Sequence, residues 1–351
     1  LEKFAFNFEV QDQCVNIRCL IIRSNEIESN QNEQQLNGLK EVNKIDLFKN
    51  RLTNLNENGC GQFLMSELSE LESLNLKENK ITTLNASFFI RMTNLVELIL
   101  SCNELCDLNN DPFCNLIRLK CLDLSGNKLR SIKRSNFLAL KTLTNLNLGE
   151  NQIESIDDYS FESLNQLIEL DLSRNQMSCM GNKLTFVGLE NLKNLHLNGN
   201  KIELVHQDTD VFDCLGELKY LCLRCNQLAS LDNRLFEPLK QLEILDLSMN
   251  RLTSIHAFTF QSLVNLAELS IENNRLSSLE SNCFNGLHKL SVLNLGANHL
   301  NEFNDATIFN DLGASLIKLD LGSNQIKHLN PNLFSNLRNL KHLLLGKQEK
   351  N

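Results

Sequence analysis

Apolar and polar positions along the chain follow one phrase that recurs from end to end. Its clearest copy, residues 119–129, spells LKCLDLSGNKL, which is L-x-x-L-x-L-x-x-N-x-L. A fourteenth copy begins at Leu337 and stops before its asparagine. Repetition at a fixed period predicts a solenoid, in which each repeat buries its leucines against its neighbours. The asparagines that mark the other copies are 24 to 29 residues apart, most often 24: Asn25, Asn50, Asn79, Asn103, Asn127, Asn151, Asn175, Asn200, Asn226, Asn250, Asn274, Asn298 and Asn324.

Within each repeat, the segment L-x-L-x-x-N predicts a short strand, because it alternates apolar with polar residues and is too short for a helix. Leu122 and Leu124 should point into the core, while Cys121 and Asp123 line the outer side of the sheet. The asparagine should bond to backbone groups of adjacent turns, since unpaired buried peptide groups are costly. We therefore predict an α/β-class solenoid curved into a horseshoe, with about 14 repeats. A parallel sheet should form its concave face, and loops and short 3₁₀ turns its convex face.

Phenylalanines form a second register that follows the asparagines. Ten residues after an asparagine stand Phe89, Phe113, Phe137, Phe161, Phe236, Phe260, Phe284 and Phe334. Extra residues in the longer repeats mostly enter before this phenylalanine. Insertions therefore belong to the descending loop rather than to the sheet.

The two ends of the chain depart from the repeat. Over residues 1–16, four apolar residues alternate with polar ones between Phe4 and Val10, which predicts an N-terminal cap hairpin that covers the edge of the first repeat strand. Residues 17–351 should form one continuous solenoid whose C-terminal cap is missing. Because terminal repeats need a polar cap for solubility, we expect self-association through this uncapped C-terminal end.

Composition narrows the partners. The net charge of −9 argues against non-specific attraction to nucleic acid or anionic membrane. No apolar run approaches the roughly 18 residues of a membrane span, so no membrane insertion is expected within this segment. The chain lacks an initiator methionine and ends in mid-repeat, which indicates a piece of a larger protein.

The repeat resembles a known family. The pattern LxxLxxLxLxxNxLxxLxxxxFxxLxxL, seen over residues 140–167, looks like the typical 24-residue class of leucine-rich repeat. That class is similar to the ectodomains of Toll-like receptors, of neuronal and adhesion receptors, and to secreted subunits such as the carboxypeptidase N regulatory chain. The resemblance implies an extracellular, protein-binding horseshoe. The family's four-cysteine N-terminal cap is reduced here to Cys14 and Cys19, and no C-terminal cysteine cap is present.

Ten of the twelve cysteines are scattered through the repeats rather than gathered in caps. Cys102, Cys106, Cys114 and Cys121 fall within twenty residues, which is compatible with a local disulfide or with free buried thiols. The one N-x-S/T sequon, at Asn85, could carry a glycan in a secreted protein, although chance alone also accounts for a single sequon.

One column across the strands has an enzyme-like composition. Between the two strand leucines, successive repeats carry Asp171, His196, Cys222 and Asp246, and Cys222 also forms C-x-x-C with Cys225. Aspartate or asparagine is the usual residue in this column, however, and an open sheet offers no oxyanion hole. We therefore predict no catalytic residue, no metal site and no cofactor.

The same face gives a hypothesis for the binding surface. The outward strand positions carry a net +2 over repeats one to three and −4 over repeats four to seven. Repeats eight and nine depart most from the usual small polar residues, and tyrosine and arginine are frequent binding hot spots. A solvated face with ordinary sequence drift is the alternative. The candidate ligand-binding residues are His196, Tyr220, Cys222, Arg224, Asp246 and Met249.

Two functions remain open. The chain is either the recognition ectodomain of a receptor or adhesion protein, which binds a protein ligand on its concave face, or a secreted scaffold or regulatory subunit that positions an enzyme or matrix partner without signalling. Both place it outside the cell or at the cell surface. A cytosolic protein is a third interpretation, favoured by the unpaired-looking cysteines and the scarcity of sequons.

Overall fold

The computed structural model describes residues 17–25, 41–55, 68–109, 111–203, 210–303, 305 and 307–348. The chain divides into two compact units, residues 1–170 and 171–351, which are described one at a time. The predicted cap hairpin over residues 1–16 lies outside the described residues, and the expectation of one continuous domain from residue 17 stays a prediction.

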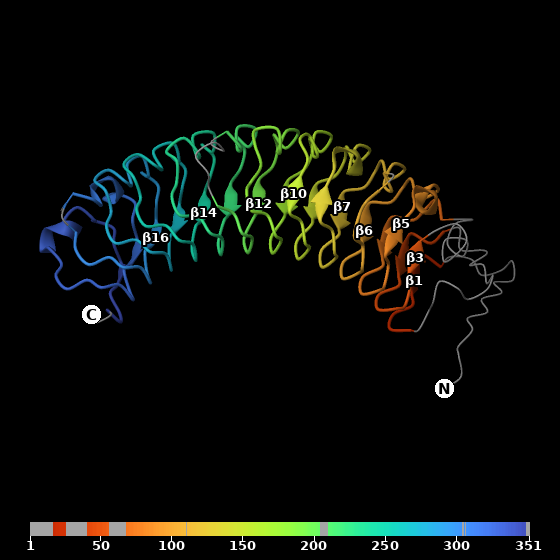
Figure 1. Cartoon of the computed structure of the whole chain (residues 1–351), viewed down its shortest axis with the longest axis horizontal. Helices are drawn as coiled ribbons and strands as arrows, with labels where there is room; N and C mark the ends of the chain where they lie inside the picture. The colour runs from red at the N-terminus through yellow and green to blue at the C-terminus, as the bar shows by residue number, and fades with distance from the viewer. Residues whose placement is uncertain are drawn as a thin grey trace, which may run out of the picture. The chain divides into compact units, whose positions relative to one another are not determined.

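Unit 1 is a stack of three-residue parallel strands joined by long loops (Figure 1). Shorter strands pair in two separate two-stranded sheets, β3 with β5 and β8 with β10. The register aligns equivalent leucines, so that Leu74 faces Leu98, and Leu98 faces Leu122. The strands of the main sheet are β1 (Cys19–Ile21), β2 (Lys44–Asp46), β4 (Ser73–Asn75), β6 (Glu97–Ile99), β7 (Cys121–Asp123) and β9 (Asn145–Asn147). The remaining elements are β3 (Asn54–Leu55), β5 (Thr83–Leu84), η1 (Ala86–Phe89), β8 (Ser131–Ile132), η2 (Arg134–Asn136) and β10 (Ser155–Ile156); β11 (Glu169–Asp171) lies at the division between the units.

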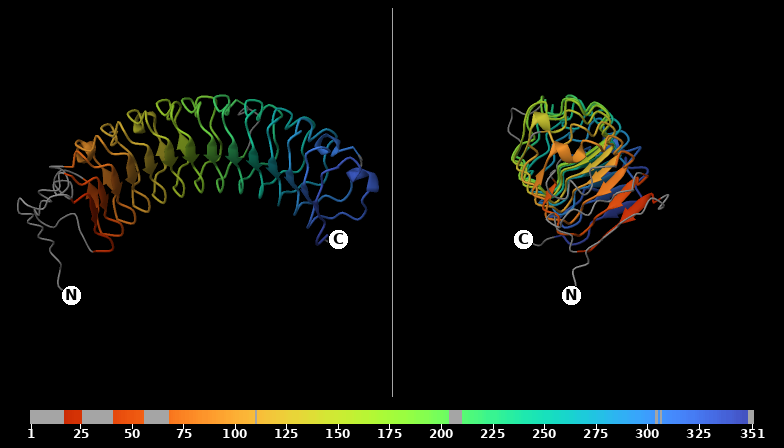
Figure 2. Two further views of the ribbon diagram at one scale, coloured as in Figure 1. Left: turned by 180° about the vertical axis from the view of Figure 1, so that it is seen from behind. Right: turned by 90° about the vertical axis from the view of Figure 1, so that its right-hand side faces the viewer.

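Unit 2 repeats the same architecture, and Figure 2 shows its loops on the side opposite the sheet. Leu221, Leu245 and Leu269 again stand in register across adjacent parallel strands. The predicted parallel-strand solenoid with short 3₁₀ turns is therefore confirmed, with a repeat number close to the one expected. Its elements are β12 (Asn194–His196), β13 (Tyr220–Cys222), β14 (Ile244–Asp246), β15 (Glu268–Ser270), β16 (Val292–Asn294), η3 (Asn310–Leu312), β17 (Lys318–Asp320), η4 (Pro331–Phe334) and β18 (His342–Leu344).

The core of each unit is built from leucines and a column of phenylalanines. Leu122 and Leu124 are buried, and Cys121 and Asp123, which alternate with them, are half-buried on the sheet surface, as the alternation predicts. The phenylalanine rings stack from one repeat to the next with centroids 5.9 Å apart in the pair Phe236–Phe260 and 6.3 Å apart in the pair Phe137–Phe161. Since such rings bury a large apolar area, this column stabilises the loop side of the solenoid.

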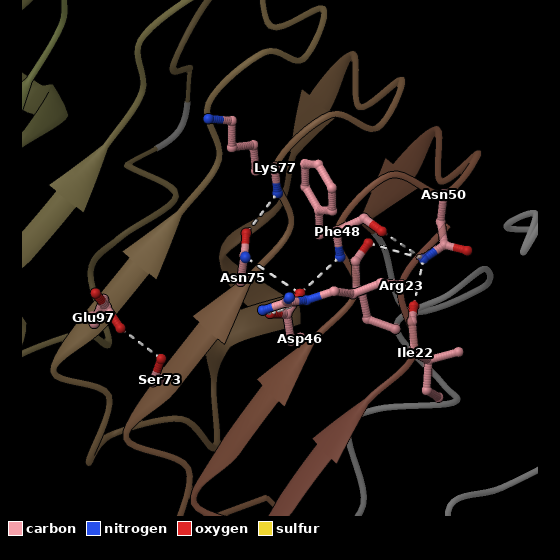
Figure 3. Close-up of polar contacts among 10 residues, drawn as sticks. Ile22, Arg23, Asp46, Phe48, Asn50, Ser73, Asn75, Lys77 and Glu97 are labelled. Carbon is pink, nitrogen blue, oxygen red and sulfur yellow. Dashed lines mark hydrogen bonds and ion pairs between the residues drawn. The ribbon is translucent and has the colours of Figure 1, made fainter. Parts of the chain in front are cut away.

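The asparagine ladder ties neighbouring repeats together. Asn127 Nδ2 donates to the carbonyl oxygens of Leu100 at 3.0 Å and Leu124 at 2.9 Å, while its Oδ1 accepts from the N–H of Leu105 at 3.1 Å. Asn50 makes the corresponding bonds to Ile22 and to its own repeat (Figure 3). One buried amide thus forms hydrogen bonds with three backbone groups that would otherwise be buried without a partner. The predicted role of the asparagine is confirmed.

The residue before each ladder asparagine adopts the left-handed conformation. Only Gly126 and Gly199 are glycines there. This turn lets the backbone N–H reach the next repeat, as in the 2.9 Å bond from Cys225 N to the Ser248 carbonyl. Because L-residues resist a positive φ, the inter-repeat bonds must offset a small conformational cost at each non-glycine position. With φ between 51° and 57°, these positions are Ser24, Lys49, Glu78, Cys102, Glu150, Arg174, Cys225, Met249, Asn273, Ala297 and Ser323.

The fourteenth repeat also completes the ladder, although the sequence pattern stops before an asparagine. Gln348 occupies that place: its Nε2 donates to the carbonyls of Leu321 at 3.0 Å and Leu345 at 3.1 Å. The preceding residue, Lys347, has the positive φ of its counterparts. The longer amide side chain therefore reproduces the bonds of the ladder asparagine. Leu343, Leu344 and Leu345 in this last turn are each between 37% and 38% exposed.

Candidate functional site

Most aspartates and asparagines on the strand face have a structural task. The residue between the two strand leucines accepts a hydrogen bond from the backbone N–H two positions later, which ends the strand in an Asx turn. Asp246 Oδ1, for example, accepts from Ser248 N at 2.9 Å. A residue type with this local role is no evidence of a binding site. The same bond forms at Asp46, Asn75, Asp123, Asn147, Asp171, Asn294 and Asp320.

In unit 2, His196 and Cys222 replace that aspartate or asparagine in two consecutive strands. The strand register places His196 beside Cys222, and Cys222 beside Asp246. The imidazole of His196 packs against the ring of Tyr220, with centroids 5.0 Å apart and planes inclined by 41°. The structure therefore brings the sequence-predicted residues of β12 to β14 onto one surface.

Arg224 extends from the end of β13 and is exposed. Its Nη1 donates to Ser248 Oγ at 2.7 Å, and the buried Ser248 hydroxyl in turn donates to Asp246 Oδ1 at 2.5 Å. This chain of bonds holds the guanidinium in one position while leaving the rest of it open to solvent. Met249, 38% exposed, projects from the left-handed turn that follows.

Burial raises the pKa of the Cys222 thiol, and the nearby Asp246 carboxylate raises it further. Burial is also the main reason that the pKa of Tyr220 lies far above its usual value, and the neighbouring Cys222 and Asp246 raise it further. Both groups are therefore protonated at neutral pH. Tyr220 presents a neutral phenol that can donate or accept a hydrogen bond.

The geometry does not favour a cysteine nucleophile. In a relay of the Cys–His–Asp type the histidine lies between the other two, whereas here Cys222 lies between His196 and Asp246. The Cys222 Sγ is 4.0 Å from Asp246 Oδ2, a neighbour that disfavours the thiolate. In the described ranges, no three His, Cys, Asp or Glu side chains are placed to hold a metal ion.

The four cysteines at positions 102, 106, 114 and 121 are free thiols, as are the other six described cysteines. Cys102, Cys106 and Cys114 are exposed and Cys121 is partly exposed, so the expectation of buried thiols is wrong for this group. Their side chains lie on the surface of the repeats, and the leucines and phenylalanines of the same repeats form the core.

The sequon asparagine, Asn85, is exposed at the start of η1. Its Oδ1 accepts from Ser87 N at 3.0 Å, so it caps the 3₁₀ turn. Glycosylation there stays a prediction.

Sequence reasoning missed one group on the strand face of unit 1. Phe48, after β2, takes a position that is serine or glycine in most repeats, and Arg23 and Lys77 take it in the adjacent repeats. Comparing residue size down this column, instead of counting charge alone, would have found it.

Comparison with protein-family models matches the chain to two models described as leucine rich repeat. The first matches residues 69–129, 93–153, 117–177, 141–202, 190–252, 217–275 and 240–300, and the second matches residues 315–337. A search of curated proteins gives no match. No helix among the described residues is long and apolar enough to cross a membrane.

Several solved structures are similar to this chain. A chain of the TLR13–ssRNA13 complex is 28% identical in sequence to this one, with a TM-score of 0.79. The match covers 93% of this chain and 46% of that chain. A chain of the Drosophila Toll–Spatzle complex is 25% identical, with a TM-score of 0.82. The match covers 94% of this chain and 42% of that chain. A leucine-rich repeat protein of Leptospira interrogans is 29% identical with a TM-score of 0.62 over 87% and 78%. The chain thus spans less than half the length of the two receptor chains.

Proposed function

Because this chain belongs to the leucine-rich repeat family, we propose that it is a protein-binding recognition domain, the ectodomain of a receptor or adhesion protein. Its protein ligand docks on the strand face of unit 2. Tyr220 and Arg224 are the anchors, and His196, Cys222, Asp246 and Met249 surround them.

The observation that carries this proposal is the ordered pair of anchors on the strand face, the half-buried Tyr220 and the exposed Arg224. The Tyr220 ring is braced by His196, and the Arg224 guanidinium by Ser248. Because these side chains are already ordered, they lose little conformational entropy when a partner binds. Tyrosine and arginine also combine apolar area with hydrogen bonding, which makes them frequent hot spots.

The family context supports a binding role rather than catalysis, because leucine-rich repeats generally serve protein interaction and not chemistry. The protonated Cys222 agrees with this assignment. Similarity to the Toll and TLR13 structures supports the receptor over a soluble scaffold, and with it an extracellular or cell-surface location.

The test is a binding screen of the folded chain against a panel of secreted and cell-surface proteins. For each hit, Tyr220→Ala and Arg224→Ala should each weaken binding by about 2 kcal/mol or more, roughly thirtyfold in Kd. Arg275→Ala is the control, because Arg275 is exposed but lies after a ladder asparagine, off the strand face. Hits that bind both anchor variants with unchanged affinity, while the variants melt like the parent, would place the site elsewhere.

A further inference from the structure

The strand face of β1, β2 and β4 in unit 1 is basic. Arg23, Lys44, Lys49 and Lys77 project from it, and we call this surface the basic face. Lys44 and Lys49 are exposed, and the side chain of Arg23 is 55% exposed. Arg23 is paired with Asp46, and the three lysines give this small surface a positive potential that attracts anionic groups.

The lysines of the basic face are not engaged in holding the repeats together. Among the described residues, none of these three ammonium groups forms an ion pair. Lysines elsewhere bridge to the adjacent repeat, as Lys128 does to Glu104 at 3.0 Å and Lys219 to Glu243 at 2.6 Å. The charge of the basic face is therefore available to a partner.

Arg23 is positioned by a buried carboxylate. Its Nε donates to Asp46 Oδ2 at 2.8 Å, and Asp46 Oδ1 accepts from Asn75 Nδ2 at 3.2 Å (Figure 3). The Asp46 side chain is only 2% exposed. The network neutralises Asp46 within the fold and fixes the guanidinium at the surface, so a ligand meets an ordered cation.

Phe48 adds an apolar contact to the basic face. Its column otherwise holds serine, glycine or polar residues, yet this ring is half-buried on the sheet surface with a basic residue in each adjacent repeat. Core packing does not require a phenylalanine there, because the core of this repeat is already filled by Ile45 and Leu47.

We propose that the basic face binds an acidic segment of a protein partner. Carboxylates of the segment pair with Lys44, Lys49, Lys77 and the outer edge of Arg23, and an aliphatic or aromatic side chain between them packs on Phe48. A short peptide suits the surface better than a nucleic acid, because the carboxylates of Glu78 and Glu97 border it and repel a continuous polyphosphate that runs past the lysines. This site does not depend on Tyr220 or Arg224, so the two proposals can fail separately.

The experiment pans a phage-displayed library of random twelve-residue peptides against the folded chain, and then measures the selected peptides as fluorescent synthetic probes. Lys44→Gln and Lys77→Gln remove charge, and Phe48→Ser installs the usual residue of its column. Lys318→Gln is the matched control, since Lys318 opens β17 of unit 2 as Lys44 opens β2. A twenty-residue oligothymidylate is measured in parallel.

The expected result is enrichment of peptides rich in Asp and Glu with an apolar residue. Their affinity should fall about threefold for each lysine variant, by a similar or larger factor for Phe48→Ser, and further with added salt, but not for Lys318→Gln. Enriched peptides without acidic residues, no enrichment, or equal loss in the Lys318 control would overturn the proposal. Tighter binding of the oligothymidylate than of any peptide, lost in the lysine variants, would replace it by a nucleic-acid site.

Discussion

The side-chain oxygen of Gln348 accepts a hydrogen bond from the backbone N–H of Ile326 at 3.0 Å. The ladder asparagines form the same bond to the preceding repeat, for example from Leu300 N to Asn324 Oδ1 at 3.1 Å. A pattern that demands asparagine misses this repeat, because glutamine offers the same amide one methylene further out. The ladder depends on amide geometry rather than on residue name.

We predict that Gln348→Ala exposes the Ile326 amide to hydrogen exchange and lowers the free energy of local opening by about 0.5–1.5 kcal/mol, the net worth of a typical hydrogen bond. Gln348→Asn should retain most of the protection, since asparagine is the ladder residue elsewhere. Hydrogen exchange read out by mass spectrometry or NMR measures both. Equal protection of Ile326 in the two variants would show that the bond contributes nothing.

Asn151→Ala should cost more, because this ladder position is buried. In the parent, the Asn151 amide forms hydrogen bonds of 3.0–3.1 Å with the carbonyls of Leu124 and Leu148 and the N–H of Leu129. The substitution leaves these three backbone groups without that partner. Leaving such groups unpaired costs about 1–3 kcal/mol. Chemical denaturation provides the measurement, and Asn301→Ala, at an exposed loop position, is the control with an expected change within about 0.5 kcal/mol.

The left-handed turn before the asparagine predicts that two substitutions at Cys225, where φ is 57°, differ in their effect on stability. Cys225→Val should destabilise unit 2 by about 1–2 kcal/mol, because a β-branched residue is strained at positive φ. Cys225→Gly should be close to neutral, since glycine adopts this conformation freely. Cys179→Val tests whether valine itself is harmful at an exposed cysteine position outside such a turn. A melting curve for each variant decides, and equal losses for Cys225→Val and Cys179→Val would remove the conformational explanation.

The sequence predicted the strand, the ladder and the phenylalanine column, because each depends on a residue type repeated at a fixed period. It did not predict the left-handed position before the asparagine, since Lys49, Cys102 and Met249 share no chemical property. That conformation comes from the hydrogen bond to the next repeat, which only the stacked structure contains. The positive φ at this position is therefore compatible with many residue types, and the sequence alone does not reveal it.

For the candidate site, the column composition identified His196 and Cys222 as departures, and the register places them side by side. The contacts that position the anchors could not be predicted, because Ser248 is an ordinary residue of its column until its hydroxyl is seen between Arg224 and Asp246. Charge counting likewise found the net +2 of the first repeats but not the burial of Asp46. Three-dimensional pairing, rather than composition, decides which charges remain available.

The Arg23–Asp46 pair makes the stability of unit 1 depend on pH. Burial by itself raises the pKa of Asp46, but the hydrogen bond from Arg23, the Phe48 N–H, the charge of Arg23 and the Asn75 amide together hold that pKa below its ordinary value. A carboxyl whose pKa is lower in the folded than in the unfolded protein binds protons preferentially when unfolded. Its contribution is therefore complete above the unfolded pKa of about 3.9 and is lost as the pH falls through that value and below.

We predict that the free energy of unfolding falls more steeply between pH 5 and pH 3 in the parent than in Asp46→Asn, which cannot titrate but keeps the turn bond that Asn75 makes in the next repeat. Arg23→Ala should raise the Asp46 pKa toward or above its ordinary value, because burial then acts with less opposition. Urea denaturation across this range and NMR titration of the Asp46 carboxyl measure the two effects. Since other carboxyls titrate equally in parent and variant, only the difference between them reports on Asp46. Parallel pH profiles for parent and Asp46→Asn would mean that the pair, despite its short contacts, leaves the proton affinity of unit 1 unchanged.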